Sequence, residues 1–475
     1  MRTERENRIP SAEEVLLEMG ASLDEGLVPA QIFNDPELHK LELERVFSRA
    51  WCFIGHESEI PSPGDYCLRY IGQDPFIFVR DESGRVRVLF DGCRHRGAMV
   101  CRAEKGNASH FRCSYHGWTY KNTGELIGAP AWRDAYGQLD KKEFSLLSAT
   151  ATESIHGFVF ATLDEDAPPL DEYLGDFRWY MDVMWGLADN GLEVVGEPQR
   201  WVMDANWKQG ADNFAGDDYH TLFLHKSMFE IGVYQIPPRA NMFGYHVHAG
   251  NGHQMSFSIA PDRDDPGPKF WGYDPEVVKL FREENVTPEQ FELAFRSRVS
   301  VGTIFPNLSF LQVPLTHDPK NTPPQGCLTV RQWQPRGPNR VEVWSWYVVW
   351  KDMPERLKEL SYRAAVGTFS VSGIFEQDDA EPWQSIARTS GTVFARKRNL
   401  QYNFQMGMGE HATSKPAADW PGPGVAFWPR YEEGVQRSLY RRWHQFMTSA
   451  SYPSSISAQE SAAASGRRDV SGNGA

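Results

Sequence analysis

Two short motifs of the chain combine cysteine with histidine. The first is Cys93-Arg-His95, and after 17 further residues comes the second, Cys113-Ser-Tyr-His116. Thiolate and imidazole ligands together bind either Zn²⁺ or an iron–sulfur cluster. Zinc sites usually pair Cys with Cys and His with His, whereas two cysteines and two histidines on one diiron cluster give a Rieske centre. The interleaved order therefore predicts a [2Fe-2S] centre, with a colourless zinc-stabilised binding module as the alternative.

A second group of possible metal ligands lies in Ala211–His225, which reads ADNFAGDDYHTLFLH. His220 and His225 would point ~140° apart on an ideal helix, so we expect either that the helix is bent there or that both side chains lean towards one side. A carboxylate from Gly373–Trp383 (GIFEQDDAEPW) would complete a two-His-one-carboxylate site, which leaves positions open for oxygen. Alone, these histidines could be ordinary core residues. A one-electron cluster in the same chain favours iron, because the cluster needs an electron acceptor.

The elements that must position these residues fall into two classes. Cys52 to Leu163 shows short apolar runs between turn residues, which predicts an all-β domain. The region after Asp164 mixes both patterns and predicts a catalytic domain with an antiparallel sheet flanked by helices, so the fold class is α+β. We expect helices over Pro36–Trp51, Trp207–Leu224, Asp274–Asn285, Pro288–Arg298 and Pro354–Val366, and strands over Glu193–Met203, Leu328–Gln334 and Arg340–Trp350.

The expected boundaries give a Rieske domain over 50–168 and a catalytic domain over 1–49 and 169–450. The Ser/Ala/Gly-rich segment 451–475 is expected to be a disordered tail. The net charge of the 475-residue chain is −14, which disfavours general nucleic-acid binding. No apolar run reaches the ~18–20 residues of a membrane span. The first ten residues have no apolar secretory core, so we expect a cytoplasmic protein with reduced cysteines.

These motifs, in this order, resemble the large (α) subunit of Rieske non-haem iron ring-hydroxylating oxygenases from roughly Ile32 to Phe446. The resemblance is strongest to the branch that oxidises polycyclic aromatic hydrocarbons, through HRGAMVCRAEKGNASHFRC and QRWVMDANWKQGADNFAGDDYHT. Two departures, Asp212 for the frequent Glu and Pro382 for the frequent Asn, leave the shape of the substrate pocket open.

The resemblance implies the ligands of both metal centres. Cys93 and Cys113 would bind one iron of the cluster, and His95 and His116 the other. The remaining ligands would hold a mononuclear Fe(II): His220, His225 and Asp379, the last of the run Glu376-Gln377-Asp378-Asp379.

The resemblance also implies a second set of site residues. Asp217 would bridge His220 to His116 of a neighbouring subunit, and Asn213 would lie near the iron. The substrate pocket would be lined by Phe214, Asn307, Phe369 and Phe375. From residue type alone, Asp217 could instead cap a helix turn and the phenylalanines could be plain core. Asp378 and Glu376 are expected to be solvated helix charges. His246, His248 and His253 are expected not to bind metal, since no carboxylate or cysteine accompanies them and the iron triad is already filled.

The implied activity is dihydroxylation of an aromatic ring to a cis-dihydrodiol with O₂. Electrons from NADH would arrive through a reductase and a ferredoxin, and the subunit would assemble as α3 or, with a small β subunit, as α3β3. A neutral bi- or polycyclic hydrocarbon is the expected substrate, because no Arg or Lys stands next to the pocket phenylalanines in the sequence. The alternatives are a dioxygenase for an aromatic carboxylate such as phthalate, a Rieske monooxygenase or demethylase, and a pure electron-transfer protein. The last would not need the Ala211–His225 motif.

Overall fold

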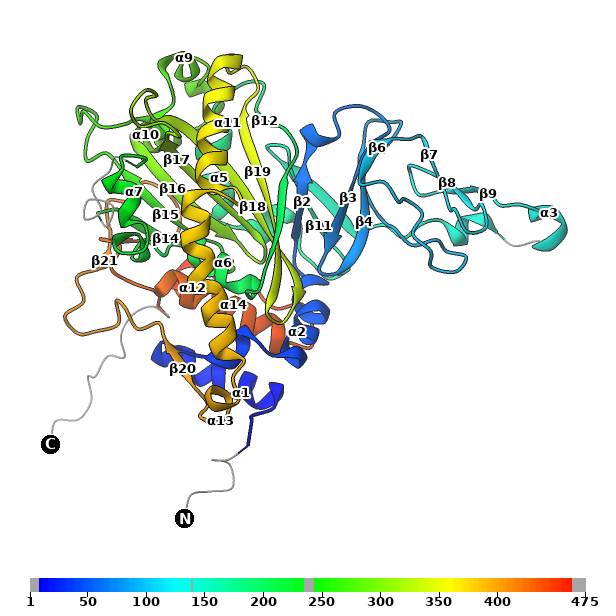
Figure 1. The fold of residues 1–475 in the computed structure, drawn as a ribbon, viewed down its shortest axis with the longest axis horizontal. Coiled ribbons are helices and arrows are strands. Elements are labelled where there is room, and N and C mark those ends of the chain that lie inside the picture. Colours follow the sequence, from blue (N-terminus) through cyan, green and yellow to red (C-terminus); the bar gives the residue numbers. More distant parts are fainter. Residues whose placement is uncertain (1–7, 138–139, 235–242, 464–475) are drawn as a thin grey trace.

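The structure, a computed structural model, describes residues 8–137, 140–234 and 243–463. One large antiparallel sheet organises the second half of the chain (Figure 1). Its central hairpin is built from two long strands, β18 and β19, and β19 is rich in β-branched and aromatic residues that favour the extended backbone. The strand order is β12 (Leu192–Val194), β19 (Arg340–Trp350), β18 (Gln325–Gly337), β17 (Leu308–Leu315), β16 (Ser297–Ile304), β15 (Gln254–Ile259), β14 (Tyr245–His248), β22 (Val425–Trp428) and β21 (Lys415–Pro416), with β13 (Gln199–Met203) also paired to β19.

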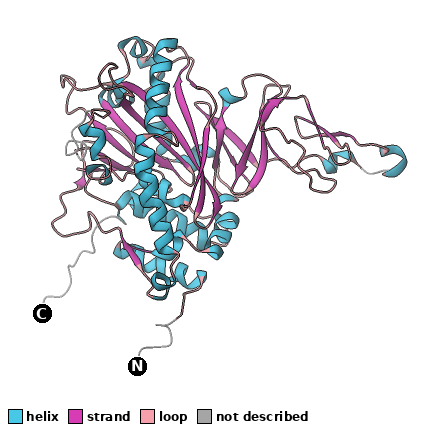
Figure 2. Ribbon diagram, viewed as in Figure 1, coloured by secondary structure: helices cyan, strands magenta, loops and turns pink. Residues whose placement is uncertain are grey.

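Three helices cover the face of this sheet that carries the candidate site. They are α6 (Trp207–Phe214), α11 (Glu355–Phe369) and α12 (Ile374–Ser390), and α11 and α12 run across the strands in Figures 1 and 2. α6 contacts β16, β17 and β18, while α11 contacts β17, β18 and β19. Alternate residues of each strand point to this face. The opposite face packs against α5 (Phe177–Trp185), where Trp185 meets Phe310 edge-on.

The all-β domain lies beside the large sheet and extends away from it, to the right in Figure 1. It joins the catalytic domain through contacts such as Phe53 against Trp346. Its three small sheets contain β2 (Cys52–His56), β3 (Asp65–Ile71), β4 (Asp74–Arg80), β5 (Val86–Phe90), β6 (Lys105–Asn107), β7 (His110–Arg112), β8 (Thr119–Lys121), β9 (Leu126–Gly128), β10 (Ala151–Ile155) and β11 (Phe158–Thr162). The predicted α+β class is thus confirmed.

The remaining helices are α1 (Ala12–Ser22), α2 (Pro36–Glu42), α3 (Trp132–Ala135), α4 (Leu170–Leu174), α7 (Lys226–Glu230), α9 (Pro275–Val278), α10 (Pro288–Arg296), α13 (Val393–Lys397), α14 (Gly434–Thr448) and α15 (Ala458–Ala463), and the remaining strands are β1 (Leu27–Pro29) and β20 (Gln401–Asn403). These elements include α3 at the far end of the all-β domain (Figure 1) and α10, which packs on α5. No helix in the described ranges is both long and apolar enough to cross a membrane.

Four expectations about elements are wrong. The helix expected over Asp274–Asn285 is two short pieces, α9 and a 3-10 turn over Glu283–Asn285. The strand expected over Glu193–Met203 is divided into β12 and β13. The helix expected over Trp207–Leu224 ends at Phe214, because Gly216 takes a positive φ of 139° and turns the chain. The expected tail at 451–475 is ordered at least to residue 463. The backbone N–H of Ile456 donates to Asn251 at 2.8 Å, and α15 packs on α14. Residues 464–475 lie outside the described residues.

Candidate metal centres and substrate cavity

The two Cys–His motifs form two loops with the same backbone pattern. In the first, Cys93 N–H donates to Ala98 O at 2.9 Å and Gly97 N–H donates back to Cys93 O at 2.8 Å. The second repeats this pattern: Cys113 N–H donates to Trp118 O and Gly117 N–H to Cys113 O. Gly97 and Gly117 have φ values of 77° and 70°, which side chains with a Cβ rarely adopt. The loops therefore present Cys93 and Cys113 in equivalent positions, while His95 follows its cysteine by two residues and His116 by three.

The four side chains of these loops fit a [2Fe-2S] cluster. The Cys93 and Cys113 thiols are buried, whereas His95 and His116 are only partly buried, with ring centroids 4.5 Å apart. His95 stacks on Trp118 at 5.1 Å, and the Tyr120 hydroxyl lies 3.3 Å from Cys93 Sγ. Two inner thiols opposite two outer imidazoles provide the Cys₂His₂ donor set of a Rieske centre.

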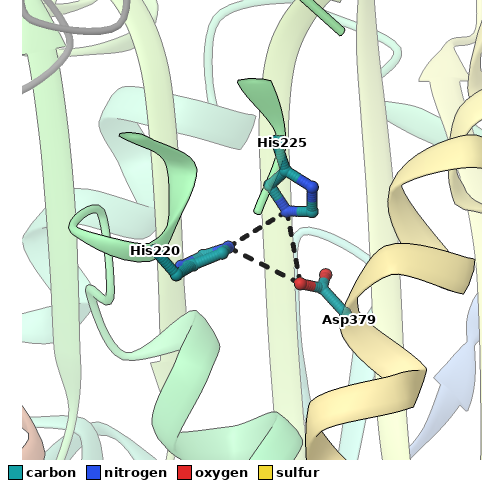
Figure 3. A group of neighbouring side chains, drawn as sticks. All are labelled: His220, His225 and Asp379. Carbon is teal, nitrogen blue, oxygen red and sulfur yellow. Dashed lines mark hydrogen bonds and ion pairs between the residues drawn. The ribbon is translucent and has the colours of Figure 1, made fainter. Parts of the chain in front are cut away.

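His220 and His225 come together because the chain is irregular between α6 and α7. After Gly216 the chain forms a short 3-10 turn over His220–Leu222, and His225 then directly precedes α7. Both histidines lie on the side of this bend that faces α12, which supplies Asp379 (Figure 3). The sequence left two arrangements open, a bent helix or two histidines that lean to one side, and the structure shows a bent chain.

The three side chains have the spacing of ligands around one metal ion. The Nε2 atoms of His220 and His225 are 3.1 Å apart, and they lie 3.6 and 3.2 Å from Asp379 Oδ1 (Figure 3). With metal–ligand bonds of about 2.1 Å, ligands at right angles lie about 3 Å apart. Asp379 Oδ1 is buried and accepts no hydrogen bond from the part of the chain that the structure describes. A buried carboxylate oxygen that has no hydrogen-bond donor is suited to bind a metal ion.

A carboxylate faces the outer nitrogen of each histidine. Asp217 Oδ2 lies 3.5 Å from His220 Nδ1, and Asp378 Oδ2 lies 3.3 Å from His225 Nδ1. Such pairs fix the ring and leave Nε2 for the metal. Burial alone would lower the pKa of His220, but the Asp217 carboxylate outweighs it and raises that pKa to about 9 in the metal-free protein. Asp378 was expected to be a solvated helix charge. That expectation is wrong, because α12 turns this side chain toward His225.

The triad opens onto a largely apolar cavity. Asn213, Phe214, Phe369 and Phe375 line it, as do Asp217 and the three triad residues. The cavity is also lined by residues that the sequence analysis missed: Asp218, Thr221, Tyr234, Val299, Val301, Leu311, Val313 and Leu315. The valines and leucines occupy alternate positions of β16 and β17, so strand alternation could have indicated that they share a face.

Asn307 is the one expected pocket residue that the structure places elsewhere. It is buried in the turn between β16 and β17, and its Oδ1 accepts a hydrogen bond from the Phe53 backbone N–H at 3.2 Å. Its side chain therefore helps to join the two domains rather than to line the cavity.

An arginine lies against the cavity phenylalanines, contrary to expectation. Arg331 of β18 is fully buried, with its guanidinium carbon 5.0 Å from the Phe214 ring centre and 5.2 Å from that of Phe369. It forms an ion pair with Glu376, which is therefore not the solvated charge that we expected. Arg331 reaches this position from a strand more than 30 residues away from Phe369, so local sequence could not indicate it.

His246, on β14, lies in a second buried polar group. Its Nδ1 is 2.7 Å from Glu432 Oε1 and its Nε2 is 3.2 Å from Asp218 Oδ2. Asp218 also pairs with Arg430 at 2.9 Å. The expectation that no carboxylate accompanies these histidines is wrong for His246, because both carboxylates come from distant segments.

Comparison with known proteins assigns both halves of the chain. Residues 50–142 match the Rieske [2Fe-2S] domain, and residues 170–449 match the ring hydroxylating alpha subunit (catalytic domain). These assignments agree with the two Cys–His loops and with the triad.

Three relatives illustrate the similarity. The chain is 37% identical over 425 residues to the N,N-dimethyl phenylurea N-demethylase subunit alpha of Sphingobium sp. (strain YBL2), covering 89% of this chain and 91% of that protein. It is 37% identical over 441 residues to the biphenyl 2,3-dioxygenase subunit alpha of Rhodococcus jostii (strain RHA1), covering 89% of each. The crystal structure of naphthalene 1,2-dioxygenase from Rhodococcus sp. bound to indole superposes with a TM-score of 0.88 at 46% identity, covering 93% of this chain and 99% of that one.

The suspected resemblance is thereby confirmed. The cofactors of such a chain are a Rieske [2Fe-2S] cluster in the first domain and a mononuclear iron in the second. The protein is an oxidoreductase. Its two domains, its triad and its relatives together show that it belongs to the family of Rieske-type aromatic ring-hydroxylating dioxygenase α subunits.

Proposed function

We propose that this α subunit converts a neutral bi- or polycyclic aromatic hydrocarbon into a cis-dihydrodiol. The observation that carries the proposal is the triad at the edge of a cavity lined mainly by Val, Leu and Phe side chains. The reaction balances as arene + O₂ + NADH + H⁺ → cis-dihydrodiol + NAD⁺. The O–O bond breaks, two C–O bonds form, and NADH supplies both electrons.

His220, His225 and Asp379 are the residues that would hold the mononuclear iron. When bound, this iron supplies adjacent open positions for oxygen. The chain's own contribution is orientation. Asp217 and Asp378 face the Nδ1 atoms and so keep both Nε2 atoms directed at the metal position. The apolar walls bind the hydrocarbon by removing its surface from water.

Electrons are proposed to reach this site from the cluster of a neighbouring subunit. Within one chain the loop between β7 and β8, which carries Cys113 and His116, lies far from α7 and α12 (Figure 1). A head-to-tail ring, α3 or α3β3, closes with one repeated interface and would bring each cluster to the next triad. Asp217 is only partly buried, so its carboxylate is available to His116 of the neighbour. A small β subunit, a ferredoxin and an NADH-dependent reductase are the proposed partners.

The apolar cavity also favours a hydrocarbon over an aromatic carboxylate. A carboxylate substrate calls for a free cation at the cavity wall. Among residues 8–137, 140–234 and 243–463, the cation beside the phenylalanines is Arg331, which lies behind them and is already paired with Glu376. Demethylation remains the second candidate function, because the phenylurea N-demethylase subunit alpha is as similar in sequence as the biphenyl 2,3-dioxygenase subunit alpha.

Product analysis separates these functions. Whole cells that express the subunit with partner proteins of the family would be given naphthalene, biphenyl, phthalate and an N,N-dimethyl phenylurea. The proposal predicts cis-dihydrodiols from the two hydrocarbons. Turnover confined to phthalate, or dealkylation without ring hydroxylation, would contradict it.

A further inference from the structure

Arg331 lies on the same face of the large sheet as the cavity, one layer behind its aromatic wall. In the strand register Ser309 pairs with Arg331 and Leu311 with Thr329, so Arg331 points to the side on which Leu311 lines the cavity. Its guanidinium contacts the rear of Phe214 and of Phe369, whose rings face the cavity. A cation over these rings favours one placement of each ring.

The same guanidinium holds both sides of the junction between α11 and α12. One NH₂ group donates to the carbonyl oxygen of Phe369, the last residue of α11, at 3.2 Å. The other forms the ion pair with Glu376, in the first turn of α12. The short link between these residues is tight at Gly373, where an added Cβ would lie 2.4 Å from the Thr368 carbonyl.

This junction carries several parts of the site at once. Phe369 and Phe375 stack across it with ring centroids 5.0 Å apart, and Phe375 meets the His225 ring at 4.8 Å. Asp379 lies one turn after Phe375 in α12. It follows Glu376 by three residues, so Asp379 and Glu376 lie on the same face of the helix. A displacement of the junction would therefore move two cavity walls and a metal ligand together.

We propose that Arg331 is a positioning residue that clamps the α11–α12 junction and thereby sets both the orientation of the aromatic substrate and the placement of Asp379. The first half of this inference rests on the proposed function, and the second half does not. The clamp needs arginine, because a planar guanidinium donates from two nitrogens in fixed directions, whereas an ammonium group is a point charge.

The test uses two variants of the complete oxygenase. In Arg331→Met/Glu376→Leu both charges of the buried pair are replaced by apolar groups, an exchange that proteins often tolerate. Arg331→Lys keeps the positive charge but loses the two fixed donor directions of the guanidinium. This variant tests the clamp even if the double variant does not fold. Arg336→Lys is the matched control, since Arg336 lies on the same strand and pairs with Glu342 instead.

Two measurements report on the clamp. The first is the ratio of regioisomeric dihydrodiols from a methylnaphthalene. It should change by about fivefold to tenfold in both variants, with roughly 1 kcal/mol corresponding to fivefold. The second is the EPR spectrum of the nitric oxide adduct of the iron-loaded enzyme without substrate, which should also change. The control should match wild type in both.

The outcomes separate the two proposals. If the wild type forms no dihydrodiol, the proposed function fails, and the nitric oxide spectrum alone still tests the clamp on Asp379. Wild-type isomer ratios and wild-type spectra in a folded, iron-loaded Arg331→Met/Glu376→Leu or Arg331→Lys protein would overturn the inference.

Discussion

Asp378 lies with its Oδ2 atom 3.3 Å from Nδ1 of His225, one residue before the candidate ligand Asp379. Asp217 stands in the same relation to His220, at 3.5 Å. The two candidate histidine ligands are thus each held by a carboxylate on the side away from the metal position. The adjacent aspartates of α12 therefore have different roles: Asp379 is a candidate metal ligand, and Asp378 orients the ligand His225.

Replacing Asp378 should weaken iron binding without abolishing it. Asp378→Ala removes the group that orients His225, and loss of such a partner typically costs 10–100-fold in metal affinity or activity. Iron content after dialysis against a graded series of chelator concentrations measures this. Glu381→Ala, at an exposed position of the same helix, is the control and should behave as wild type. An Asp378→Ala protein that loses more iron than Asp379→Ala would show that the roles of the two aspartates are reversed.

Each triad residue should be necessary for the mononuclear iron and dispensable for the cluster. His220→Ala, His225→Ala and Asp379→Ala each remove one of three converging ligand atoms, so we expect loss of that iron and of activity. The Rieske EPR signal should persist, because the cluster ligands lie in the other domain. Iron analysis combined with EPR of the reduced protein checks both parts, and full iron content in any of the three would refute the ligand set.

The cluster should depend on two of the six cysteines more than on the others. Cys93→Ser and Cys113→Ser should abolish the red-brown colour and the Rieske signal, since these thiols sit in the two matched loops. Cys101→Ser is the matched control: this thiol is also buried in the same domain, but its Sγ lies 3.4 Å from the Ala103 carbonyl, outside those loops. A retained cluster in both loop variants would show that other residues bind it.

Deprotonation of His246 should lower the free energy of unfolding at alkaline pH. Burial would lower the pKa of this histidine, but Asp218 and Glu432 outweigh burial and raise it from 6.5 to about 9. The folded protein then binds a proton that the unfolded chain has released. The stabilisation is complete below about pH 6.5 and is lost as pH rises through 9, at up to about 1.4 kcal/mol per pH unit. The urea midpoint should therefore drop between pH 7 and 9.5 more steeply in wild type than in His246→Gln, and parallel curves would contradict the assignment.

Local sequence was sufficient for those parts of the site that a single segment builds. The Cys–His loops and the strand Arg340–Trp350 follow from spacing and alternation within a few residues. The helix at Pro288 also followed from local sequence, because Thr287 is a favourable cap and proline is favoured at the first helical position, and the structure adds a capping box between Thr287 and Gln290. Helix geometry indicated either a bend near His220 and His225 or two side chains that lean to one side.

The parts that sequence did not predict are made by contacts between distant segments. Arg331 and Glu376 are 45 positions apart, and only the packing of α12 on β18 makes them a pair. Asp378 resembles any exposed helical aspartate until α7 is placed beside it. Ile456 and α15 are ordered because Asn251 and α14 supply the partners that a Ser/Ala-rich segment lacks on its own.

The central claim is that electrons enter the iron site through the Asp217–His220 pair, and single-turnover reoxidation of the reduced cluster tests it most directly. Asp217 Oδ1 also accepts the His220 backbone N–H at 3.2 Å, so Asp217→Asn, which keeps that acceptor and removes the charge, should be compared with Asp217→Ala. After substrate and O₂ are added to protein with both metal centres loaded, we expect reoxidation to slow by about 10- to 100-fold in both variants. Wild-type rates in an Asp217→Ala protein with full iron and cluster content would contradict the account.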